Sequence, residues 1–122
     1  MTAFRYIVSD VDEAVAFYTT VLDFELEEQY GPAMALVRRQ DSTLWLAGPP
    51  SSAARPMPDG SQPVPGGWNR IVIEVDDLAA QVERLRATGV RLRNDIVIGP
   101  RGRQVLVEDP SGNPIELFQP SR

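Results

Sequence analysis

The residue types that this sequence lacks restrict its chemistry strongly. Its 122 residues include no histidine and no cysteine. Without histidine the chain loses the commonest zinc and iron ligand and the usual general base at neutral pH. Without cysteine it can form neither a thiolate nucleophile nor a disulfide. These absences exclude thiolate chemistry and every Ser-His-Asp or Cys-His arrangement.

Three predicted strands carry such groups on one face. Alternation along residues 70–75 (RIVIEV) places Ile71, Ile73 and Val75 on the core side and leaves the other three side chains on the opposite face. The same rule applies to residues 42–48 and 114–119. The residues on the face away from the core are Thr43, Trp45, Ala47, Arg70, Val72, Glu74, Glu116 and Phe118. Trp45 and Phe118 could stack on a planar ligand, or they could simply cover the sheet.

Few groups could transfer protons. Glu116 is the strongest candidate, and Tyr6 and Tyr18 are the only others for which we expect burial. Tyr6 falls on the core side of its strand and Tyr18 on the apolar stripe of a helix. Neither tyrosine predicts an active site.

The elements that position these residues occur in the same order twice. The first set is a strand at 3–8, a helix at 11–22 that Asp10 caps, and strands at 24–30, 33–39 and 42–48. The second is a strand at 70–75, a helix that Asp76-Asp77 caps and Gly89 ends, and strands at 90–97, 102–108 and 114–119. We therefore predict an α+β fold of two tandem βαβββ modules.

A constant spacing supports a tandem duplication. The segment VSDVDEAVAFY overlies VDDLAAQVERL with every residue 67 positions apart, and later Trp45 overlies Glu116. We assign module one to about 1–48 and module two to about 68–122. Residues 49–67 between them are rich in proline, glycine and serine. They are either a linker or a flap in which Met57 and Val64 could touch a ligand.

Composition limits the class of protein. A chain of this length fits one domain, and its net charge of −5 disfavours a nucleic-acid partner. No stretch approaches the roughly 20 apolar residues of a membrane span, and the start MTAFRYIVSD does not read as a signal peptide. We therefore expect a cytoplasmic protein.

Three segments in order, SDVDEAVAFYTTVLDF, GGWNRIVIEVDDL and EDPSGNPIELFQP, make the chain resemble the vicinal oxygen chelate superfamily of glyoxalases, bleomycin resistance proteins and extradiol dioxygenases. The resemblance covers essentially the whole chain. It implies paired βαβββ modules whose sheets curl around a cleft. In metal-using members, four positions on the first and last strands of the modules hold a divalent ion.

Carried over residue by residue, those four positions are Ala3, Trp45, Arg70 and Glu116. Only Glu116 can bind a metal, whereas zinc, nickel or iron sites take three or more protein ligands. We therefore predict neither a metal nor a cofactor. The Arg70 guanidinium could occupy the place of the ion and pair with Glu116, or this pair could merely fill a vestigial site.

Three functions stay open. The first is a metal-free protein of the bleomycin-resistance type, which binds an aromatic or cationic small molecule through Trp45, Arg70, Val72, Glu116 and Phe118. The second is a metal-dependent lyase or dioxygenase of the glyoxalase kind, and the third a metal-free lyase or isomerase that uses Arg70 and Glu116. The resemblance also implies a homodimer, which the edge strands and Trp68 would permit.

Overall fold

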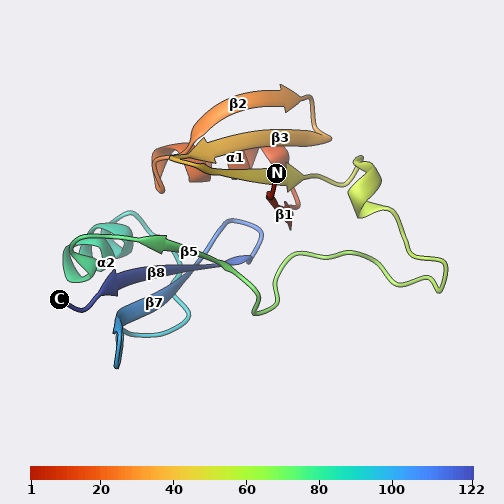
Figure 1. The fold of residues 1–122 in the computed structure, drawn as a ribbon. Helices are drawn as coiled ribbons and strands as arrows, with labels where there is room; N and C mark the ends of the chain where they lie inside the picture. The colour runs from red at the N-terminus through yellow and green to blue at the C-terminus, as the bar shows by residue number, and fades with distance from the viewer. The chain divides into compact units, whose positions relative to one another are not determined.

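The computed structural model describes all 122 residues, and the chain divides into two compact units, Met1–Gly66 and Gly67–Arg122. Each unit combines one α-helix with one four-stranded mixed sheet, as Figure 1 shows. The predicted α+β fold with two tandem βαβββ modules is confirmed. The strands form two separate sheets and not one continuous sheet.

The first unit contains the elements predicted for module one. They are β1 (Phe4–Ile7), α1 (Val11–Thr20), β2 (Glu25–Tyr30), β3 (Met34–Arg39) and β4 (Ser42–Ala47). The sheet order is β1-β4-β3-β2, with β1 parallel to β4 and the other pairs antiparallel. A short 3-10 helix, Ser52–Ala54, follows in the segment between the sheets.

The second unit repeats this plan. Its elements are β5 (Ile71–Glu74), α2 (Leu78–Ala87), β6 (Val97–Gly99), β7 (Gly102–Glu108) and β8 (Pro114–Pro120). The sheet order is β5-β8-β7-β6, again with one parallel pair at the start of the order.

Strand registers confirm the duplication independently of the sequence. In the first sheet Phe4 lies opposite Leu44, and in the second Ile71 lies opposite Ile115. Phe4 and Ile71 are 67 positions apart, as in the aligned helix segments, and Leu44 and Ile115 are 71 apart, as are Trp45 and Glu116. Trp45 and Glu116 therefore occupy equivalent places on β4 and β8.

Both helices begin as the sequence predicts. The Asp10 carboxylate accepts a hydrogen bond from the Glu13 backbone N–H at 2.9 Å, and the Asp77 carboxylate accepts one from Ala80 at 3.1 Å. These bonds satisfy N–H groups that have no partner inside the first turn. At the end of α2, Gly89 takes the expected left-handed conformation, with φ of 80°. Helix α1 ends at Thr20, two residues before the predicted boundary.

Each sheet buries one face. In the first unit the Tyr18 ring of α1 is fully buried and makes an edge-to-face contact with Phe24 at 5.5 Å between ring centroids. In the second unit Leu78, Val82 and Leu85 of α2 are buried, as are Ile115 and Leu117 of β8. Because strand side chains alternate, Glu116 and Phe118 lie on the opposite face of that sheet.

The predicted strand at 90–97 is wrong. Only Leu92 forms a bridge there, with Val107, and the regular strand β6 does not start until Val97. The Asn94 side chain explains the break, because its Oδ1 accepts the Leu106 backbone N–H at 2.9 Å. A side-chain oxygen thus takes a place that a backbone carbonyl would fill in a regular ladder.

Neither helix is long and apolar enough to cross a membrane.

Candidate ligand-binding residues

An ion pair lies on the face of the second sheet that points away from the buried residues Ile115 and Leu117. Arg70, just before β5, donates from Nε and Nη2 to Oε1 of Glu116 on β8, at 3.0 and 2.8 Å. The Glu116 residue is 8% exposed, so its carboxylate depends on this partner. A third nitrogen, Nη1, donates to the Trp68 carbonyl at 3.2 Å. The contact between Arg70 and Glu116 that the sequence suggested is therefore present.

Two further predicted residues border this ion pair. Val72 lies directly opposite Glu116 in the parallel β5–β8 register and is 54% exposed. Phe118 follows two residues along β8 and is partly exposed. A Cβ on Gly102 would come within 2.9 Å of the Phe118 ring and 2.2 Å of the Gln119 carbonyl oxygen. Glycine at the start of β7 is therefore required for the Phe118 ring to lie where it does.

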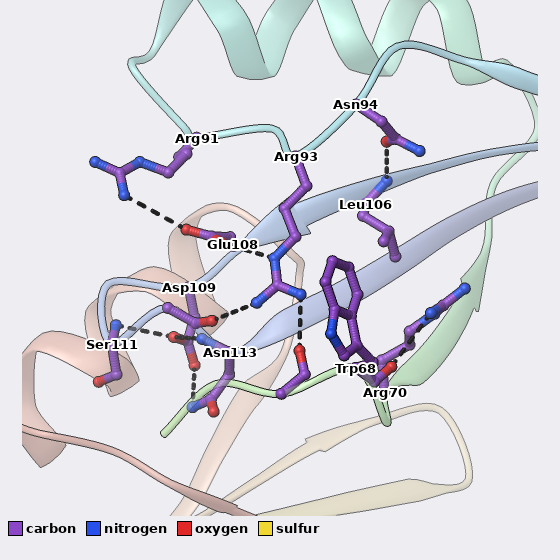
Figure 2. A network of polar contacts seen from close by, with 12 residues as sticks. Trp68, Arg70, Arg91, Arg93, Asn94, Leu106, Glu108, Asp109, Ser111 and Asn113 are labelled. Atoms are coloured by element: carbon purple, nitrogen blue, oxygen red, sulfur yellow. Dashed lines mark hydrogen bonds and ion pairs between the residues drawn. The ribbon is translucent and has the colours of Figure 1, made fainter. Parts of the chain in front are cut away.

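A second arginine cluster, around Arg93, was not predicted. Arg93 donates to Glu108 Oε2 at 2.7 Å, to the Gly67 carbonyl at 2.7 Å and to the Gly112 carbonyl at 2.9 Å (Figure 2). Its guanidinium also lies 4.7 Å from the centre of the Trp68 ring. This one side chain joins the segment before β5, the end of β7 and the β7–β8 turn.

The Arg93 cluster is connected to Arg70 through Trp68. Trp68 contacts Arg93 through its ring and Arg70 through its carbonyl, as Figure 2 shows. The turn that supplies the Gly112 carbonyl is itself held by Asp109, whose Oδ1 accepts the backbone N–H groups of Ser111 and Asn113 at 2.9 Å. The alternation of Arg91 and Arg93 opposite Glu108 is the signal in the sequence that could have revealed this cluster.

In the first unit the equivalent position is Trp45, and it too is covered by an arginine. Arg5 lies opposite Trp45 in the β1–β4 register, and its guanidinium carbon is 5.0 Å from the centre of the indole ring. Trp45 is partly exposed and Arg5 is exposed. Alternation alone placed Trp45 on this face, whereas Arg5 was not among the predicted residues.

These residues do not fit a divalent metal ion. Nowhere in the chain do three or more histidine, cysteine, aspartate or glutamate side chains gather as a metal site requires. Of the four positions that correspond to ligands, Ala3 and Trp45 offer no donor atom. Arg70 directs two N–H groups at the one carboxylate, and a cation at that place would repel the ion.

Comparison with known proteins defines the family. The sequence matches the glyoxalase/bleomycin resistance protein/dioxygenase superfamily over residues 1–117. The chain belongs to this superfamily. None of the curated proteins matches the sequence significantly.

Solved structures of superfamily proteins share the fold. A lactoylglutathione lyase from Agrobacterium tumefaciens is 20% identical, with a TM-score of 0.77 over 98% of this chain and 92% of that one. TnmS3, an antibiotic-binding protein from Streptomyces sp. CB03234, is 28% identical, with a TM-score of 0.70 over 99% and 97%. The fosfomycin resistance protein FosX from Listeria monocytogenes is 14% identical, with a TM-score of 0.74 over 99% and 93%.

The three structures differ in what they support. At 20% and 14% identity, the lyase and FosX demonstrate the shared superfamily fold and nothing about activity. TnmS3 is more similar in sequence and spans almost the same length. Superfamily membership therefore admits binding proteins as well as enzymes, and the residues of this chain must decide between them.

Proposed function

We propose that this chain is a small-molecule-binding member of the superfamily that does not use a metal ion at the ancestral ligand positions. Its ligand is an aromatic or cationic molecule. The candidate binding residues are Trp45 in the first unit and Arg70, Val72, Glu116 and Phe118 in the second. The single observation that carries the proposal is the contact of Arg70 with Glu116, because it occupies the only carboxylate among the four positions that correspond to metal ligands.

The character of the faces supports binding. Each unit offers one partly exposed aromatic ring, Trp45 in the first and Phe118 in the second, and the second adds a charged pair whose hydrogen bonds are largely satisfied within the protein. Sites for small molecules are typically lined by apolar and aromatic side chains, with a small number of polar groups that orient the ligand. The antibiotic-binding protein TnmS3, at 28% identity, is a relative for which such a role is named.

Calorimetry with three naphthalene probes tests the proposal. The probes are 2-naphthoate, 2-naphthamide and 2-naphthylmethylammonium, which share a ring and differ in charge. At least one should bind, and Trp45→Ala should weaken it about tenfold, since aromatic contacts contribute roughly 0.5–1.5 kcal/mol beyond their buried area. Tyr30→Ala, which removes an exposed aromatic ring from edge strand β2 of the same sheet, is the control and should leave affinity unchanged. Equal affinity in Trp45→Ala would show that the site is wrongly assigned.

Metal loading separates this proposal from a metal-dependent lyase or dioxygenase. The purified chain is incubated with Zn²⁺, Ni²⁺, Mn²⁺ or Fe²⁺, dialysed and assayed for bound metal by elemental analysis. We expect far less than one ion per chain, because a single carboxylate already paired with arginine is a poor site. Stoichiometric metal that disappears in Glu116→Ala would establish the enzyme hypothesis instead.

The oligomeric state belongs to the same proposal. We expect a homodimer, as the superfamily resemblance implies, and sedimentation velocity tests it.

A further inference from the structure

We propose that Arg5 and Trp45 form an anion-recognising subsite, and that the ligand of this chain is an aromatic carboxylate. The inference rests on the proposed function and specifies its ligand class. It begins from a contact that sequence alternation did not reveal, the guanidinium of Arg5 over the ring of Trp45 at 5.0 Å.

The charge of Arg5 is not neutralised by the protein. Arg5 is exposed, and no carboxylate lies within ion-pair distance of it. The nearest acidic residue of its row is Glu28, which lies opposite Leu36 at the far edge of the same sheet. Three strand spacings of about 4.8 Å place the two backbones roughly 14 Å apart. Glu28 forms no ion pair with Arg5, and its carboxylate instead accepts a hydrogen bond from the Tyr30 hydroxyl.

Arg70 shows the contrasting arrangement. Its guanidinium directs two nitrogens at Glu116 and a third at the Trp68 carbonyl, so most of its donors are engaged and its charge is balanced. Arg5 instead lies over the Trp45 ring, and none of its side-chain N–H groups donates to a carboxylate or a carbonyl of the protein. Of the two arginines, only Arg5 is therefore prepared to accept an anion.

The surroundings of Arg5 indicate the rest of the ligand. Trp45 lies beside it on β4, and Leu36 lies beside Trp45 on β3. Both side chains are partly exposed. A carboxylate can form paired hydrogen bonds with a guanidinium, while an attached ring lies against the indole and the leucine. A cationic ligand would bind best over the face of the indole ring, but the Arg5 guanidinium already lies there and would repel it.

The three naphthalene probes and two variants test this inference on the full chain. We expect 2-naphthoate to bind about tenfold more tightly than the isosteric neutral 2-naphthamide, and more tightly than 2-naphthylmethylammonium. Arg5→Gln should abolish the preference for naphthoate over naphthamide and leave affinity for naphthamide within about twofold. Arg103→Gln, which removes an exposed arginine of β7 that has no ion pair, should keep the preference.

The outcomes distinguish this inference from the proposed function. Tighter binding of the ammonium probe, or a naphthoate preference that survives Arg5→Gln, overturns the anion subsite while small-molecule binding at Trp45 stands. Failure of all three probes to bind at millimolar concentration overturns the proposed function and the inference with it. Because Arg5 is exposed, circular dichroism should show the Arg5→Gln variant folded, so a change in selectivity reports on binding.

Discussion

Arg93 and Arg91 provide a comparison in which one carboxylate serves two arginines of different burial. Both pair with the Glu108 carboxylate. The Arg93 side chain is 16% exposed, with 2.7 Å between its Nε and Glu108 Oε2, whereas the Arg91 side chain is 81% exposed, with 3.7 Å between its Nη1 and Glu108 Oε1. We expect Arg93→Ala to destabilise the protein substantially and Arg91→Ala to have almost no effect.

The magnitude follows from the groups that Arg93→Ala leaves behind. The Gly67 and Gly112 carbonyls each lose a charged donor, and Trp68 loses the cation over its ring. Glu108 keeps only the distant Arg91. Hydrogen bonds to charged groups contribute about 1.5–3 kcal/mol each, less where the partner is rehydrated, so we expect a loss of about 2–4 kcal/mol in the free energy of unfolding. An exposed ion pair such as that of Arg91 with Glu108 contributes roughly 0–1 kcal/mol to the free energy of unfolding.

Urea unfolding measures both changes. Circular dichroism follows the whole chain, and tryptophan fluorescence in a Trp45→Phe background reports on Trp68 alone. Arg93→Lys should fall between the wild type and Arg93→Ala, because an ammonium retains the charge but cannot reach three partners in a plane. Equal effects of Arg93→Ala and Arg91→Ala would refute the argument that burial and geometry, rather than charge alone, make Arg93 important.

Three further predictions follow from the second unit and from β2. Gly102→Ala should destabilise the protein by about 1–3 kcal/mol, because its Cβ would lie 2.2 Å from the Gln119 oxygen. Gly99→Ala, whose nearest contact is 3.7 Å, is the control and should change the urea midpoint little. A double-mutant cycle of Arg70→Ala and Glu116→Gln should give a coupling energy of about 1–3 kcal/mol, and additive effects would contradict the ion pair. The pKa of Tyr30 lies above its usual 10.0 because its hydroxyl donates to the Glu28 carboxylate, so Glu28→Gln should lower it in an ultraviolet titration, whereas an unchanged value would exclude the contact.

Local patterns sufficed to predict most of the fold. Asp10 and Asp77 cap helices with the expected hydrogen bonds, and the stripe through Tyr18 is buried. These features depend on residues close together in the sequence, where periodicity and capping act. The prediction of a strand at 90–97 was wrong because it depended on a contact between distant residues. The Asn94 side chain accepts a hydrogen bond from Leu106 of β7, and alternation along residues 90–97 carries no information about that contact.

The candidate site divides in the same way. Alternation and the duplication were enough to place Trp45 and Glu116 on equivalent positions, and the family resemblance added the suggestion that Arg70 reaches Glu116. The contacts of Arg5 and Arg93 could not be predicted so directly. Long arginine side chains can reach several neighbours, and the choice depends on which carbonyl groups and rings the folded backbone brings near.

The two arginines that cover the central positions occupy different repeat positions. Arg5 lies opposite Trp45 in its strand register, and its repeat mate 67 residues later is Val72, which lies opposite Glu116. The mate of Arg70 in the first module is Ala3. An arginine inherited from one ancestral module would occupy the same repeat position in both. In each module a guanidinium instead lies over the position that corresponds to a metal ligand in the family, and it comes from a different repeat position in each, which is the pattern expected if both positions serve something other than a metal ion.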